Sequence, residues 1–297
     1  AALLPVKIGK DGEERRRIRH VWHNPVAWRE AVARASTPSQ RIMRWFIFVA
    51  GTVAAVWLLI YWFGIPVASR GGMRLQMQEI LGATLIIEAV VAMVAAASAA
   101  GTAIARDREN GTFELMQTTP LTSNYILAGK LRGLVTLSAP LLVVPTLTAL
   151  LFVLAEMGRT TKLLNPASVI AIPIVLLTHI AVVAIIGMHI SLRQKNTTKA
   201  VLMSVGTVMA VYLPLTLACY GVGTSWSIFT GLNPIMFILT CVGAQNTATG
   251  GASADVLGEA IKLMLIAVIG SAAILVGVWQ GYLSMVKNFD FTLRRQT

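Results

Sequence analysis

Two sets of residues in this sequence could do chemistry. The first is residues 106–130, a polar and charged segment that lies between very apolar stretches. The second consists of three ionisable side chains inside apolar stretches, Glu88, His179 and His189. Carboxylates and imidazoles suit proton transfer or metal binding, whereas a charged segment between apolar stretches suits contact with another protein.

The spacing of the histidines does not favour a metal site. His179 and His189 are ten residues apart, which on a helix is a rotation of about 280° after full turns, or about 80° in the shorter direction, so they are not aligned on one face. Neither has an HExxH-type partner, and hydrogen bonds between packed helices are the favoured use. Cys219 and Cys241 form no CxxC pair, and two buried free thiols are favoured over a disulfide.

Glu88 is the only carboxylate deep in an apolar stretch, within LIIEAVVAM. A charge there costs at least ~2.5 kcal/mol, so we expect it to face protein or water rather than lipid. Two interpretations remain open. Glu88 lines a substrate or ion path, or it is protonated and hydrogen-bonded to a neighbouring helix.

The composition indicates an integral membrane protein. Of the 297 residues, 56% are hydrophobic and only 13% are charged, and the mean hydropathy is +0.70. Soluble domains average about 25% charged residues, and this chain has too few to cover a water-exposed surface. Six stretches are apolar over the ~20 residues that a membrane-spanning helix needs. They are residues 43–65, 80–105, 131–155, 167–192, 200–220 and 260–286.

The loops between these stretches predict the orientation. Of the 25 lysines and arginines, 20 fall on the side that carries both chain ends, and the positive-inside rule makes that side cytoplasmic. Residues 106–130 lie on the same side. The net charge of +12 is thereby explained, and no nucleic-acid partner is predicted. We expect kinks at Pro173 and Pro214, which fall inside the fourth and fifth spans.

Two further segments flank this six-span domain. After a basic stretch, residues 1–23, residues 24–37 (NPVAWREAVARAS and Thr37) carry alanine, valine and tryptophan on one helical face and charges on the other. This pattern predicts a helix lying in the cytoplasmic interface, with a soluble helix packed on another domain as the alternative. The outer segment 221–259 contains a short apolar run after Asn233-Pro234, either a helix dipping into the membrane or a surface loop.

The polar segment has the features of a docking element. Asn110-Gly111 is a turn pair, and Thr112 can cap a short helix that Pro120 prevents from continuing. Such a helix presents an apolar patch, made of Phe113, Leu115 and Met116, beside Glu114. A loop that only connects two spans could be far shorter, so we interpret 106–130 as a contact with another protein.

These residues resemble the signature of type-2 ATP-binding-cassette (ABC) transporter permeases, which runs Glu-x-Gly-Thr-x-Glu-x-Leu, then Thr-Pro-Leu, then Gly-Lys. The matching positions here are Glu109, Gly111, Thr112, Glu114, Leu115, Thr119, Pro120, Leu121, Gly129 and Lys130. The amphipathic 24–37 segment is similar to the elbow helix of that family. The resemblance covers the chain from about residue 20 to its end.

The resemblance implies an all-α membrane permease that moves substrate out of the cell, at a bacterial inner membrane. Its coupling helix would dock on a cytoplasmic ABC ATPase. The docking residues it implies are Arg108, Glu109, Gly111, Thr112, Phe113, Glu114, Leu115, Pro120 and Leu121. This chain has no phosphate-binding loop, so ATP and Mg²⁺ are expected on the ATPase, and no cofactor on this chain. A second permease half, identical or paralogous, is expected too.

Two other classes of function are alternatives to a permease. A membrane scaffold would dock an ATPase without transporting anything, and would show no substrate-dependent turnover. An intramembrane enzyme would have only Glu88 and the two histidines for catalysis, with no Ser/His or paired-Asp arrangement to support it. The sequence favours the permease and does not identify the substrate.

Overall fold

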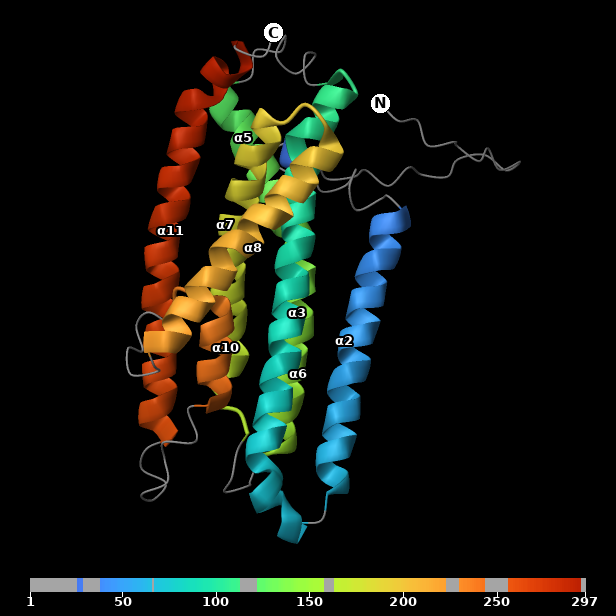
Figure 1. The fold of residues 1–297 in the computed structure, drawn as a ribbon, viewed down its shortest axis with the longest axis vertical. Coiled ribbons are helices and arrows are strands. Elements are labelled where there is room, and N and C mark those ends of the chain that lie inside the picture. The colour runs from blue at the N-terminus through green and yellow to red at the C-terminus, as the bar shows by residue number, and fades with distance from the viewer. Residues whose placement is uncertain are drawn as a thin grey trace, which may run out of the picture.

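The computed structural model describes residues 26–28, 38–65, 67–112, 122–157, 163–222, 230–243 and 256–294. Helices dominate this part of the chain, and no strand occurs in it. Six of its helical segments are long and apolar enough to cross a membrane, which confirms the predicted all-α membrane fold with six spans. The start of the first span and the end of the last lie at the same end of the bundle, as an even number of spans requires (Figure 1).

The six spans have these bounds. They are α2 (Pro38–Gly64), α3 (Val67–Glu109), α5 with α6 (Ser123–Ser138 and Val143–Ala155), α7 (Ser168–Arg193), α8 (Thr197–Val222) and α11 (Val256–Arg294). Helix α3 is 43 residues long, which at 1.5 Å per residue is about 65 Å. It is therefore about twice as long as a ~30 Å hydrocarbon core and projects from the membrane.

The third span is not one α-helix. A 3₁₀ turn, Ala139–Leu142, separates α5 from α6 at Pro140. Proline has no N–H and its ring clashes with the carbonyl four residues earlier, so the α-helical hydrogen-bond pattern is interrupted there. By contrast, α7 and α8 run as single helices through Pro173 and Pro214. The kinks expected at these two prolines stay a prediction.

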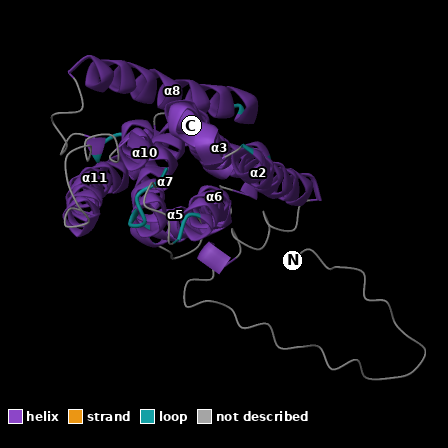
Figure 2. Cartoon of the chain, turned by 90° about the horizontal axis from the view of Figure 1, so that it is seen from below, coloured by secondary structure: helices purple, strands orange, loops and turns teal. Residues whose placement is uncertain are grey.

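Helices α3 and α7 form the centre of the bundle and contact each other most extensively. Helix α8 crosses one side of this pair, α5 and α6 cover the other, and α2 and α11 stand at opposite edges (Figure 2). The short helix α10 (Pro234–Gly243) packs against α3, α7 and α8. It confirms a helix after Asn233-Pro234 that is too short to cross the membrane.

Large apolar side chains remain exposed on all six spans, and the spans of α2, α8 and α11 are the least buried. They include Trp45, Phe46 and Trp57 on α2, Leu202 and Leu217 on α8, and Leu257, Val276 and Trp279 on α11. In water such faces would drive aggregation, but lipid solvates them. These helices therefore present the surface expected of a membrane protein.

Two predicted segments fall largely or wholly outside the described residues. Of the proposed interfacial helix 24–37, Val26–Trp28 is helical and the rest is not described. Residues 113–121, which contain most of the proposed coupling helix, also lie outside. The elbow and the coupling helix stay predictions, as does the basic N-terminal segment 1–23.

Candidate functional site

The polar segment leaves the bundle from a well-defined turn at the end of α3. Gly111 has a φ of 66°, the left-handed conformation that glycine adopts without steric cost. Its N–H donates to the carbonyl of Arg108 at 3.0 Å, and the N–H of Asn110 donates to that of Arg106 at 3.1 Å. The Thr112 hydroxyl donates to the carbonyl of Asp107 at 3.1 Å. The turn thus satisfies carbonyls at the helix end and fixes the direction in which residue 113 leaves.

A buried ion pair joins the two helices on either side of the polar segment. Lys130 of α5 is almost completely buried, and its Nζ lies 2.5 Å from Oδ2 of Asp107 on α3. The same ammonium group donates to the carbonyl of Ala103 at 2.9 Å. Residue 112, where the segment leaves α3, and residue 122, where it rejoins α5, are therefore held by helices that are tied together.

The next two residues of α3 hold the connection between α7 and α8. The Arg108 guanidinium donates to the carbonyls of Leu192 and Gln194 at 3.0 and 3.1 Å, at the C-terminal end of α7. The Glu109 carboxylate accepts from the N–H and the hydroxyl of Thr197, both at 2.6 Å, at the N-terminus of α8. A cation at a helix C-terminus and an anion at an N-terminus both match the helix dipole.

We call Asp107, Arg108 and Glu109 of α3, together with Lys130 of α5, the α3 clasp. Through it the last turn of α3 contacts three other helices, α5, α7 and α8. Partners that are 23 to 88 residues away in the chain meet there. The end of α3 is therefore linked to the ends of all three helices.

Close packing of small residues extends this connection into the bundle. The Ser191 hydroxyl of α7 accepts from the N–H groups of Ile104 and Ala105 on α3 at 3.0 and 2.9 Å. A Cβ atom on Gly187 would lie only 2.5 Å from the Cβ of Ala100. A Cβ on Gly101 would similarly meet the backbone and Ser204 of α8 at about 3 Å. Small residues thus let α3 approach α7 and α8 closely, as is common between membrane helices.

Of the nine predicted docking residues, Arg108, Glu109, Gly111 and Thr112 are described, and all four make contacts within the chain. The other five, Phe113, Glu114, Leu115, Pro120 and Leu121, lie outside the described residues. Contact with an ATPase stays a prediction for all nine. Sequence reasoning missed Asp107, Ser191 and Thr197 as members of this site.

Glu88 lies between α2, α3 and α6. Its residue is 8% exposed, and one carboxylate oxygen accepts from the Thr148 hydroxyl of α6 at 3.0 Å. A Cβ on Gly51 of α2 would lie 3.5 Å from the same oxygen. The other oxygen, Oε2, is buried and has no hydrogen-bond partner in the described part of the chain. Glu88 thus faces neighbouring helices rather than lipid.

The remaining candidates lie apart from this site. The ring nitrogens of His179 are 2.7 and 3.2 Å from the carbonyl oxygens of Val175, in the same helix, and of Leu232, in the turn before α10, so hydrogen bonding between packed helices stays a prediction. Within the described ranges no group of three or more His, Cys, Asp or Glu side chains could hold a metal ion. Cys241 is a buried free thiol.

Comparison with known proteins identifies a family. The family model described as "ABC-2 family transporter protein" matches residues 12–286. This range contains the α3 clasp and all of the spans except the last residues of α11. No curated protein matches the chain.

Proposed function

The chain belongs to the ABC-2 family of transporter proteins and is the membrane-embedded permease subunit of an ABC transporter, and we propose that it forms one half of an ATP-driven exporter. In this proposal a separate cytoplasmic subunit binds and hydrolyses ATP. A second permease half, identical or paralogous, completes the path. Residues 113–121 dock on the ATPase, and the substrate crosses between the two halves.

The observation that carries this proposal is the α3 clasp at the base of residues 113–121. A connecting loop would need no such anchorage. A segment that transmits force from a bound ATPase needs such anchorage, because force passes to the helices only through contacts that stay intact. Arg108 and Glu109 hold both sides of the α7–α8 connection, and Lys130 holds α5. Displacement of the docked segment would therefore move four helices together.

The clasp also suggests how the nine predicted docking residues divide their roles. Arg108 and Glu109 are engaged inside the chain, so we assign them to transmission. Gly111 and Thr112 set the direction of the segment. Phe113, Glu114, Leu115, Pro120 and Leu121 would then provide the surface that meets the ATPase. Loss of docking and loss of transmission should be separable by mutation.

The test is a mild-detergent purification from the native membrane of the wild type, Glu114→Arg, Arg108→Gln and the control Arg106→Gln. Arg106 lies on the same turn of α3 as Arg108 but is exposed. Co-purified proteins are identified by mass, and ATP hydrolysis is measured in each sample. We expect Glu114→Arg to lose the ATPase. Arg108→Gln should retain it with turnover lowered about tenfold, in the range of allosteric coupling energies, while Arg106→Gln behaves like the wild type.

Three results would count against the proposal. If no ATPase accompanies the wild type, the chain does not dock one. If the ATPase is present but its turnover never responds to any exported compound, the scaffold function is correct instead. If Arg108→Gln and Arg106→Gln have equal turnover, the clasp does not transmit force.

Glu88 is the residue that we propose for the substrate path, because its Oε2 is buried without a partner in the described part of the chain. Glu88→Gln should keep the bond from Thr148 and the thermal stability but lower transport. Thr148→Val, which removes only the donor, is the matched comparison. Unchanged transport in Glu88→Gln would assign the residue to packing alone.

A further inference from the structure

Helix α2 approaches the bundle very closely at Gly51. A Cβ atom on Gly51 would lie 2.2 Å from a methyl carbon of Val144 on α6 and 3.5 Å from the Glu88 carboxylate on α3. Arg44 lies seven residues earlier on α2, which is two turns and about 10 Å nearer the predicted cytoplasmic side. Seven residues bring a helix back to almost the same direction, so Arg44 points toward the bundle, as Gly51 does.

A cavity opens beside Arg44, between α2, α3 and the end of α5. Its volume is about 100 Å³, which is room for several water molecules. Helix α3 contributes Ala95 and Ser98 to its wall, and the end of α5 contributes Leu137 and Ser138. Among the described residues that line this cavity, Arg44 is the charged one. We call it the Arg44 cavity.

Two hydrogen-bond donors that line this cavity have no partner in the part of the chain that the structure describes. The Arg44 guanidinium belongs to a half-buried residue and makes no hydrogen bond or ion pair there. Ser138 is 4% exposed and precedes the 3₁₀ turn, yet its hydroxyl makes no capping hydrogen bond and no other bond in that part. Buried polar groups in folded proteins nearly always have a partner. Arg44 and Ser138 can therefore both donate to a molecule in the cavity.

The charge and the arrangement of these donors favour a phosphate group. A guanidinium presents several N–H groups in one plane and binds phosphate oxygens in pairs. The Ser138 hydroxyl belongs to a different helix from Arg44, and the oxygens of a phosphate point in several directions, so one phosphate can accept from both residues. Ser98 adds no donor, because its hydroxyl already donates to the carbonyl of Ala95 at 2.8 Å.

From these contacts we infer that the Arg44 cavity binds a phosphate group through Arg44 and Ser138. Arg44 is two residues inside the span Ile42–Gly64, so the cavity lies near the predicted cytoplasmic surface of the membrane. Two sources carry a phosphate there, an anionic phospholipid of the cytoplasmic leaflet and a soluble phosphate compound, and the experiment below separates them. The inference depends neither on ATPase docking by residues 113–121 nor on a transport role for Glu88.

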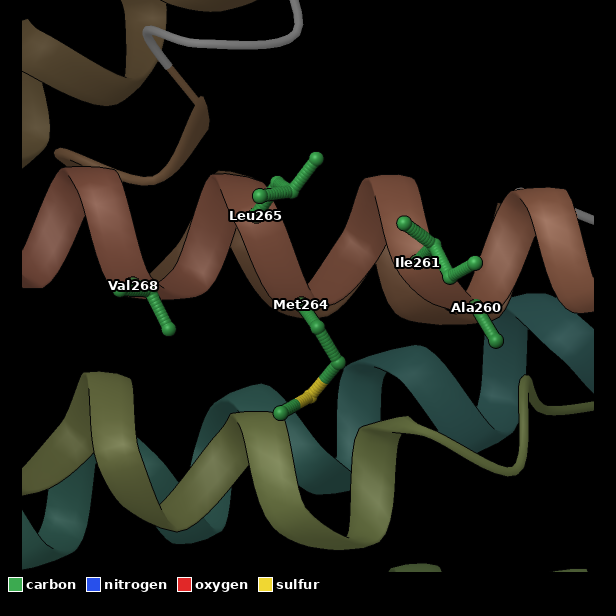
Figure 3. Close-up of a pocket in the computed structure, with 5 residues that line it drawn as sticks. All are labelled: Ala260, Ile261, Met264, Leu265 and Val268. Carbon is green, nitrogen blue, oxygen red and sulfur yellow. The ribbon is translucent and has the colours of Figure 1, made fainter.

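A hollow on α11 shows by contrast what the proposed site requires. It is lined by Ala260, Ile261, Met264, Leu265 and Val268 (Figure 3). Met264 points toward the neighbouring helices, whereas Leu265 points away from them. Its described lining residues all come from one helix, and none has a charged or hydroxyl-bearing side chain. These residues therefore offer a phosphate no side-chain donor.

The experiment uses the full chain, purified in a neutral maltoside detergent and freed of lipid. Phosphatidylglycerol and phosphatidylcholine are added at equal concentration, and the bound lipids are counted by native mass spectrometry. Soluble phosphate is tested separately with radiolabelled inorganic phosphate, with unlabelled phosphate as the competitor. Both measurements are made on the wild type, Arg44→Gln, Ser138→Ala, Ala95→Leu and the control Lys199→Gln.

If the source is a lipid, we expect phosphatidylglycerol to bind about fivefold more strongly than phosphatidylcholine, as one arginine near an anionic headgroup gives. If the source is soluble, inorganic phosphate binds instead. In either case Arg44→Gln should abolish the binding, and Ser138→Ala should weaken it several-fold, because one hydrogen bond to a charged group is lost. Ala95→Leu fills the cavity without changing its charge and should abolish the binding too. Lys199→Gln removes an exposed basic residue of α8 and should preserve it.

Three results would overturn the inference. If neither probe binds the wild type more strongly than it binds Arg44→Gln, the cavity holds no phosphate. If Ala95→Leu and Ser138→Ala both bind like the wild type, Arg44 meets headgroups outside the cavity. An equal loss of binding in Arg44→Gln and Lys199→Gln would assign the effect to overall charge. Because Ser138→Ala and Ala95→Leu leave Arg44 in place, they test the cavity even if Arg44→Gln does not fold.

Discussion

The ion pair between Lys130 and Asp107 offers the sharpest test of the α3 clasp. The side chain of Lys130 is 1% exposed and that of Asp107 is 16% exposed, and their charged atoms are 2.5 Å apart. Lys130→Met keeps most of the length and volume of the side chain but removes its charge. The substitution leaves the Asp107 carboxylate and the Ala103 carbonyl without the ammonium group that both contact.

Removing one partner of a buried ion pair costs about 3–5 kcal/mol, because the other charge stays buried. For a chain of this size, each kcal/mol corresponds to roughly 2–4 °C in Tm. Asp107 keeps some contact with solvent, so the lower part of this range applies. We therefore expect Lys130→Met to lower the Tm by about 6–10 °C.

The assay is thermal unfolding in detergent, followed with a dye that becomes fluorescent on reaction with a thiol. Cys241 is buried in α10 and becomes reactive when the bundle opens. Lys199→Met is the control, because it makes the same substitution at an exposed position. Adding Asp107→Asn to Lys130→Met should recover part of the loss, since it removes the stranded carboxylate. A Tm for Lys130→Met within about 2 °C of the control would refute the buried pair.

Two other predictions concern the packing of the bundle. Gly187→Val should lower the Tm by several degrees, because its Cβ would lie 2.5 Å from the Cβ of Ala100 on α3 and overpacking costs about 1–3 kcal/mol. The control is Gly206→Val, which faces open space and should leave the Tm unchanged. The Gln78 amide donates to the carbonyl of Val242 at 3.0 Å and so holds α10, the helix that carries Cys241. Gln78→Leu should therefore raise the reactivity of Cys241 toward thiol reagents. The control Gln76→Leu, at an exposed position, should leave that reactivity unchanged. Equal Tm values for the two glycine variants would contradict the close packing of Gly187, and equal thiol reactivity in the two glutamine variants would contradict the bond from Gln78 to α10.

The spans could be predicted from the sequence because each is set by the length of its own apolar run. The break at Pro140 differs from the continuous third span that the sequence predicts. Pro173 and Pro214 each stand alone in a helix that continues, whereas Pro140 is followed by Pro145 one turn later. Two prolines in successive turns remove two backbone hydrogen bonds from the same stretch. The number of prolines per turn was the signal available in the sequence.

The clasp could not be predicted because its partners are distant in sequence. The run from Arg106 to Glu109 is visibly charged, but successive residues on a helix point 100° apart. Asp107 therefore reaches α5, while Arg108 and Glu109 reach the ends of α7 and α8. Only the packing of the helices decides which neighbour each one meets. The family signature marked Lys130 but did not indicate that Asp107 would be its partner.

Helix α5 connects the α3 clasp to α11. Lys130 and Arg132 are two residues apart, so they point to nearly opposite sides of α5, Lys130 toward α3 and Arg132 toward α11. The 3₁₀ turn at Pro140 separates α5 from α6, and a break of this kind lets a short helix tilt without moving the rest of its span. A tilt of α5 driven through the clasp would change the contacts that α5 makes with α11.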